Sequence, residues 1–148
     1  MIFPNDRHAL RRRFIEAWRK ACSGGIMEPL EIQIAEVIAE HPEYQALLER
    51  ADAALDKDYL AETGETNPFL HMALHIAVRE QVATDRPPGI QHAFHALLAE
   101  RPERADAEHV MLDCLAETLW SAQRAGRTPD EDAYLERIRE RIRRSGRH

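Results

Sequence analysis

Prolines and glycines divide this chain into apolar segments of helical period, and this division constrains the fold more than any other feature. Pro29, Pro42, Pro68 and Pro129 each stand where a proline can occupy the first turn of a helix. Gly126 stands where a helix can end. Between these positions, apolar residues recur every three to four residues, and alternation at every second residue is hard to find. The pattern predicts an all-α protein.

The length of 148 residues fits a single domain over residues 1–148. We expect a compact bundle of about six or seven helices, mostly with short connections. The segment 56–66 has no periodicity and is the longest expected loop, and the basic end of the chain, about 143–148, is expected to fray. The expected helices cover about 5–21, 29–40, 42–54, 68–84, 90–101, 104–125 and 129–142.

The net charge and the cysteine spacing indicate in which cellular compartment the protein is expected and which partners are not expected. The formal net charge is −6, whereas general nucleic-acid binding calls for a basic face, so nucleic acid is not an expected partner. The first ten residues lack the apolar core of a signal peptide, and no apolar run approaches the roughly 20 residues of a membrane span. Cys22 and Cys114 are isolated, as in a reducing compartment. We therefore expect a cytoplasmic protein without a membrane partner, and homo-oligomerisation stays open.

His71 and His75 form one half of a candidate metal site. They lie four residues apart on the expected fourth helix, so their side chains project side by side. Their neighbours are among the most apolar in the chain, and desolvation favours the neutral imidazole that a metal ion binds. The alternative is a pair of core histidines satisfied by a carboxylate or a backbone carbonyl.

His109 and Asp113 repeat the same spacing on the expected sixth helix. If the two helices face each other, His71, His75, His109 and Asp113 supply three nitrogens and one carboxylate. This set suits a mononuclear divalent transition metal, either tetrahedral zinc or iron, manganese or nickel with open positions. The alternative is that Asp113 pairs with an arginine on the surface.

Three further residues are candidates to surround this site. Glu117 lies one turn beyond Asp113 and is a candidate fifth ligand, a partner for a histidine ring, or a general base for metal-activated water. Glu31 lies beside apolar residues of the second helix, although a first-turn carboxylate is equally well explained by the helix dipole. His41 precedes Pro42 and is better explained as an N-cap residue, but its segment can fold over a site.

A competing hypothesis is a helical docking module for a protein or another acidic partner, with structural histidines and no metal. The first helix is basic, and the last carries Arg141, Arg143 and Arg144. The same arginines also fit an ordinary exposed helix with ion pairs. The sequence contains no glycine-rich phosphate loop or nucleophile motif, so it does not assign an enzymatic reaction.

Several stretches of the chain together resemble an uncharacterised bacterial family, domain of unknown function 1841. The resemblance covers nearly the whole chain and implies a small bacterial protein, without assigning an activity, cofactor or ligand. The stretches are W-R-K (18–20), H-P-E-Y (41–44), N-P-F-L-H-M-A-L-H-I-A-V-R-E-Q-V-A-T-D-R-P-P-G-I (67–90) and A-E-H-V-M-L-D-C-L-A-E (107–117).

Overall fold

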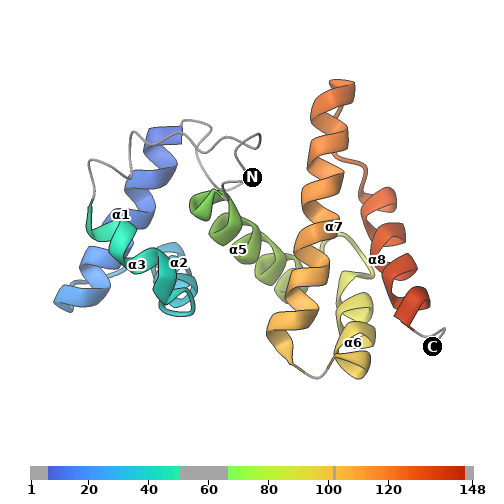
Figure 1. Ribbon diagram of the computed structural model, residues 1–148, viewed down its shortest axis with the longest axis horizontal. Helices are drawn as coiled ribbons and strands as arrows, with labels where there is room; N and C mark the ends of the chain where they lie inside the picture. The colour runs from blue at the N-terminus through green and yellow to red at the C-terminus, as the bar shows by residue number, and fades with distance from the viewer. Residues whose placement is uncertain (1–6, 51–66, 102, 146–148) are drawn as a thin grey trace. The chain divides into compact units, whose positions relative to one another are not determined.

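The computed structural model describes residues 7–50, 67–101 and 103–145, and these residues contain seven helices and no strand (Figure 1). The all-α prediction is confirmed. The predictions for the loop at 56–66 and for the last residues, 146–148, lie outside the described residues. The helices are α1 (Arg7–Ser23), α2 (Pro29–Ala39), α3 (Pro42–Glu49), α5 (Pro68–Thr84), α6 (Ile90–Glu100), α7 (Arg104–Ala125) and α8 (Glu131–Ser145).

The chain divides into two compact units, Met1–Ile76 and Ala77–His148, and α5 contributes residues to both. The expectation of one domain over residues 1–148 stays a prediction. None of the described helices is both long and apolar enough to cross a membrane.

Most helix ends lie where the prolines and glycines predict them. Pro29, Pro42 and Pro68 are the first residues of α2, α3 and α5, where the missing N–H of proline costs no helical hydrogen bond. Gly126 ends α7 with a φ of 65°, a left-handed conformation that glycine adopts without strain. Local sequence therefore determines where these helices start and stop.

The last helix begins later than its sequence predicts. α8 starts at Glu131, and the Oδ1 atom of Asp130 accepts a hydrogen bond from the backbone N–H of Ala133 at 3.1 Å. Asp130 thus caps a donor of the first turn, and Pro129, the expected first helical residue, precedes the helix. The buried face of α8 carries Tyr134, Leu135 and Ile138.

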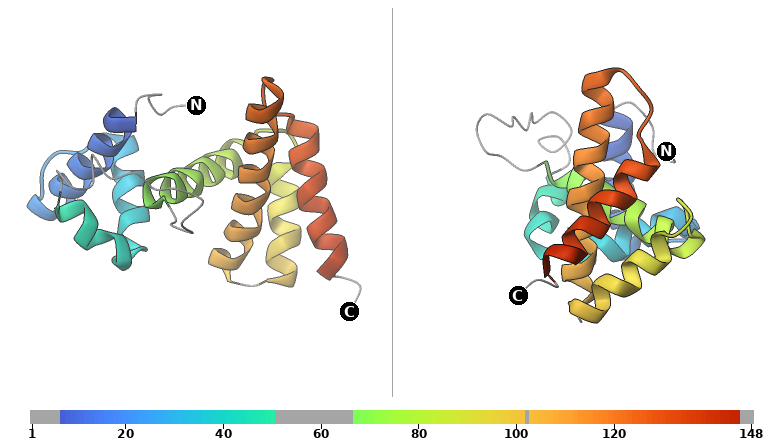
Figure 2. Two further views of the ribbon diagram at one scale, coloured as in Figure 1. Left: turned by 45° about the horizontal axis from the view of Figure 1, so that its top comes forward. Right: turned by 90° about the vertical axis from the view of Figure 1, so that its right-hand side faces the viewer.

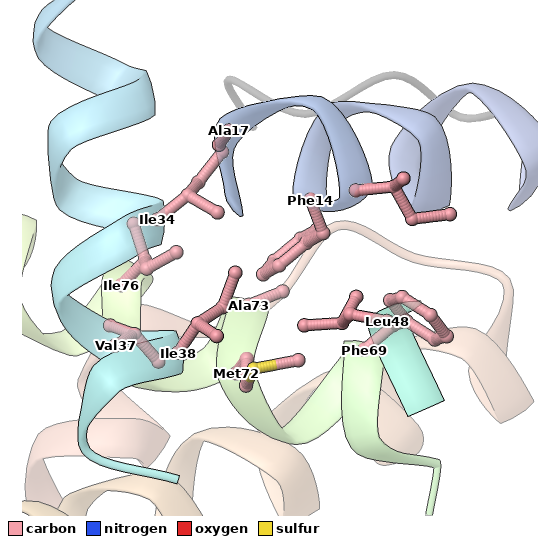
Figure 3. Packing of buried hydrophobic residues seen from close by; sticks show 11 residues of the cluster. Phe14, Ala17, Ile34, Val37, Ile38, Leu48, Phe69, Met72, Ala73 and Ile76 are labelled. Carbon is pink, nitrogen blue, oxygen red and sulfur yellow. The ribbon is translucent and has the colours of Figure 1, made fainter. Parts of the chain in front are cut away.

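One apolar cluster in the first unit joins residues of α1, α2, α3 and α5 (Figure 3). The rings of Phe14 and Phe69 meet edge to face, with centres 5.9 Å apart. Each large side chain buried in this way stabilises the fold by about 1.5–3 kcal/mol. The cluster fixes how the first part of α5 packs within this unit. Its other members are Ile15, Ala17, Ile34, Val37, Ile38, Leu48, Met72, Ala73 and Ile76.

In the second unit, α6, α7 and α8 lie side by side and run in alternating directions (Figure 2). Cys114 is buried, and this burial raises the pKa of its thiol to about 11, as expected of a core cysteine. Trp120 of α7 does not lie in the core, because its side chain is 58% exposed. The guanidinium of Arg124 lies over its ring instead, 4.6 Å from the centre, so a cation rather than the core covers this residue.

The second unit also buries a carboxylate. Glu108 is only 2% exposed, and its two oxygens accept hydrogen bonds from Nε of Arg79 and Nε of Arg104, each at 3.0 Å. A buried charge is stable only when it is paired and hydrogen-bonded. Glu108 meets this requirement with one arginine from α5 and one from α7.

Candidate metal centre

The start of α5 sets the positions of its two histidines. The Oδ1 atom of Asn67 accepts hydrogen bonds from the backbone N–H groups of Phe69 and Leu70 at 3.0 and 3.2 Å. Asn67 is therefore the N-cap residue of α5. Because the cap fixes the first turn, His71 and His75 project from one face of α5, one turn apart.

The two imidazoles face each other through their Nε2 atoms, which lie 3.2 Å apart. Their ring centres are 4.8 Å apart. Two nitrogens bound to one tetrahedral zinc ion at about 2.0–2.1 Å lie about 3.3–3.4 Å from each other. The observed separation therefore matches that of two ligands of one ion.

The third imidazole comes from the junction between α2 and α3. The Nδ1 atom of His41 lies 2.7 Å from the carbonyl oxygen of Val37. A carbonyl can only accept a hydrogen bond, so Nδ1 carries the proton and the neutral ring keeps its lone pair on Nε2. A hydrogen bond of this kind typically orients a metal-binding histidine and fixes its tautomer. His41 thus has its ring orientation and its ligand atom set by the end of α2.

Together, His41, His71 and His75 form a group whose ligand atoms all lie within 4.8 Å of one another. The ring centre of His41 lies 5.3 Å from that of His71 and 5.1 Å from that of His75. His41 and His75 are 9% and 3% exposed, and His71 is half-buried. The separations need to contract only from at most 4.8 Å to about 3.4 Å for one ion to bind all three.

Tyr44 adds an aromatic wall to this group. Its ring stacks on that of His41 with an interplanar angle of 7° and centres 5.5 Å apart, and it meets His71 edge to face at 6.3 Å. Burial, and secondarily the negative charge of Glu43, raises the pKa of the Tyr44 phenol. The phenol is therefore neutral near physiological pH, and the stacked ring restricts the rotation of His41.

His41 was expected to act mainly as an N-cap residue, whereas in the structure its side chain belongs to the histidine group. It does occupy the N-cap position of α3, but its side chain makes no capping hydrogen bond. The imidazole turns back to Val37 instead. The break between α2 and α3 was visible in the sequence, whereas the approach of this break to α5 depends on the packing of the first unit.

The second half of the sequence-predicted set lies in the second unit. Nδ1 of His109 donates a hydrogen bond to the carbonyl oxygen of Ala105 at 2.7 Å, and the side chain is exposed. Asp113 is 60% exposed and lies 3.8 Å from Nη2 of Arg141, which is the surface pairing named as the alternative. That His109 and Asp113 join His71 and His75 in one centre stays a prediction.

Glu31 and Glu117, which were candidates to surround the metal site, each lie beside a cationic side chain in the structure. Glu31 is buried; its Oε1 accepts the backbone N–H of Glu28 at 3.0 Å, and its Oε2 accepts a hydrogen bond from Lys20 at 2.8 Å. These two bonds lower the pKa of the Glu31 carboxyl. Glu117 is 61% exposed and lies 3.9 Å from Nε of Arg137.

The remaining candidates lie on exposed helix faces. His92 and His95 are exposed on α6. Of the arginines in the docking hypothesis, Arg141 faces Asp113, while Nη2 of Arg143 donates to Glu136 at 2.6 Å and Arg144 is exposed. The prediction of a docked partner stays a prediction.

A protein-family model described as Domain of unknown function (DUF1841) matches residues 6–140. The chain belongs to this family. The match confirms the resemblance and includes all three histidines of the group, together with Tyr44. Comparison with curated proteins and with solved structures gives no match.

Proposed function

We propose that this member of the DUF1841 family binds one divalent transition-metal ion through His41, His71 and His75. The observation that carries the proposal is the convergence of three imidazole ligand atoms within 4.8 Å in a largely buried region. A metal ion binds through the lone pairs that neutral imidazole rings present.

The chemistry of the ligands indicates the kind of ion. Imidazole nitrogens suit zinc, copper, iron and nickel, whereas magnesium and calcium prefer oxygen. Zinc fits the separation of His71 and His75 directly, because its ligands adopt a tetrahedral arrangement. Zinc is therefore the first ion to test, followed by copper, iron and nickel.

Metal uptake by the chain purified without a histidine tag tests the proposal. Elemental analysis after incubation with Zn²⁺ and gel filtration is expected to give about one ion per chain. The double variant His71→Ala/His75→Ala should retain none. The matched control His92→Ala/His95→Ala also removes two histidines from one helix, but from an exposed face, and it should bind as the wild type does.

Two outcomes would contradict the proposal. If the His92→Ala/His95→Ala control loses as much metal as the His71→Ala/His75→Ala variant, uptake does not depend on this centre. If the wild type takes up none of the four metals, the histidines are structural, and the competing proposal of a helical docking module gains support.

A further inference from the structure

We infer that the metal ion controls the docking of α3 on the apolar cluster of the first unit, so that this short helix responds to metal. This inference rests on the proposed function and adds a conformational consequence of metal binding. It is carried by the weak anchoring of α3 and by the position of His41 at the start of this helix.

α3 is a short helix with few buried residues. It has eight residues, whereas isolated helices shorter than about 12–15 residues are marginal in water and depend on packing. Of its residues 42–49, all of which the structure describes, only Leu48 is buried, and Tyr44 and Leu47 are partly buried. Four residues of α2 are buried. Because segments with few buried contacts open locally at a low cost in free energy, we expect α3 to open more readily than α2.

His41 joins the metal centre to the first turn of α3. Its carbonyl oxygen accepts a hydrogen bond from the backbone N–H of Tyr44 at 3.0 Å, and its ring stacks on the Tyr44 ring. The Tyr44 ring also meets that of His71 edge to face. The side chain of His41 makes no capping hydrogen bond to α3. The first turn of α3 is therefore attached to the centre through the backbone of His41 and through the two stacked rings.

The three ligands come from two places in the chain, so one ion would cross-link them. His71 and His75 lie on α5, whose first part packs in the apolar cluster, whereas His41 lies between α2 and α3. An ion bound to all three would hold His41 in the orientation on which the first turn of α3 is built. A ligand favours the conformation to which it binds more tightly. Metal binding therefore favours the docked α3, and the docked α3 in turn strengthens metal binding.

Hydrogen–deuterium exchange of the untagged wild-type chain measures this coupling. Exchange is compared in EDTA and in free Zn²⁺ at about 100 times its dissociation constant. In EDTA, we expect the amides of α3 to exchange faster than those of α2. With Zn²⁺, exchange in α3 should slow by about 10-fold to 100-fold, because an opening that releases the ion becomes up to about 100-fold rarer at this concentration. Exchange in α6, α7 and α8 should not change.

A variant outside the histidine group provides the reciprocal test. Leu48→Ala weakens the apolar anchor of α3 without removing a metal ligand, so it should lower the affinity for Zn²⁺ by about 5-fold or more. The matched control Leu97→Ala removes a buried leucine from α6 in the second unit and should bind Zn²⁺ as the wild type does. Equal affinities of these two variants would contradict the coupling.

The wild-type exchange rates test the inference even if Leu48→Ala does not fold. If the amides of α3 exchange as slowly as those of α2 in EDTA, the helix is docked without the ion, and the inference is overturned. Unchanged exchange in α3 of a chain that takes up one Zn²⁺ ion also overturns it, but leaves the proposed metal site intact. If the wild type takes up none of the four metals, the proposed function fails, and this inference fails with it.

Discussion

Glu108 in the second unit and the histidine group in the first unit are both largely buried polar groups, but their partners differ in kind. In the second unit, Glu108 is a buried anion held between the cationic side chains of Arg79 and Arg104. In the first unit, His71 and His75 turn their Nε2 atoms towards each other, and His41 lies beside them. One arrangement pairs opposite charges, whereas the other brings together groups of the same kind.

Under the proposed function, the first arrangement is structural and the second binds a metal ion. A carboxylate between two arginines is complete without a ligand and holds two helices in place. His71 and His75 can share one hydrogen bond between their Nε2 atoms, and the lone pairs of neutral imidazoles can also bind a metal ion. The predictions below test this distinction in order of decreasing effect.

The largest loss of stability is expected from Glu108→Ala. It leaves Arg79 without its buried carboxylate partner, and breaking a buried ion pair costs about 3 kcal/mol or more. We expect the lower end of this range, because Arg104 is 66% exposed. Urea unfolding followed by Trp120 fluorescence in a Trp18→Phe background measures the loss.

The exposed Glu117, which lies 3.9 Å from Arg137, provides the control on the same helix. Glu117→Ala should cost at most about 1 kcal/mol. Neither variant should change the affinity for Zn²⁺. A large loss of Zn²⁺ affinity in Glu108→Ala would contradict the assignment of a purely structural role to Glu108.

Zn²⁺ should stabilise the first unit. At a free concentration about 100 times the dissociation constant, a ligand specific for the folded state adds about 2.7 kcal/mol. Trp18 belongs to the first unit and packs against its apolar cluster. Its fluorescence, read in a Trp120→Phe background, should therefore report a higher midpoint of urea unfolding with Zn²⁺. An unchanged midpoint, with His75→Ala behaving identically, would speak against a site in this unit.

A smaller effect is expected at Tyr44. Its stacked ring restricts His41, so Tyr44→Ala should weaken Zn²⁺ binding by about 10-fold, the usual effect of losing a group that orients a metal ligand. Tyr44→Phe keeps the ring and should bind as the wild type does. Leu47→Ala removes a partly buried side chain from the same helix and controls for general loosening. Competition with a chromophoric chelator measures all three affinities.

The smallest effect concerns Glu31 and acid. The backbone N–H of Glu28 and the ammonium of Lys20 lower the pKa of Glu31 below its ordinary value of 4.5. A depressed pKa means that Glu31 stabilises the fold above this value and that the contribution is lost as the pH falls through the folded pKa. Glu31→Gln should therefore be less stable than the wild type near neutral pH, and the difference should disappear in acid. Urea unfolding without metal at both pH values tests this, and a difference that grows in acid would contradict it.

The fold was predictable to the extent that local chemistry determines it. Asn67 and Pro68 identify the start of α5, and the four-residue spacing places His71 beside His75 in any helix. The type of a residue was a weaker guide to whether its side chain is buried. Trp120 lies exposed under Arg124 because the rigid ring can be covered by a neighbouring cation as well as by a core.

The complete histidine group could not be read from the sequence in the same way. His41 reaches the centre only because the apolar cluster packs the α2–α3 junction against α5, and this is a tertiary contact without a local signal. The spacing of His109 and Asp113 is also a local signal, and their joining His71 and His75 in one centre stays a prediction.

The most direct test of the central claim compares His41→Ala with His109→Ala in calorimetric titrations with Zn²⁺, using chains without a histidine tag. If His41, His71 and His75 form one centre, His41→Ala should lose more than about 100-fold in affinity, because removing a ligand exceeds the usual cost of removing an outer partner. His109→Ala should bind one ion with unchanged affinity. The opposite pattern, with binding retained in His41→Ala and lost in His109→Ala, would contradict the claim.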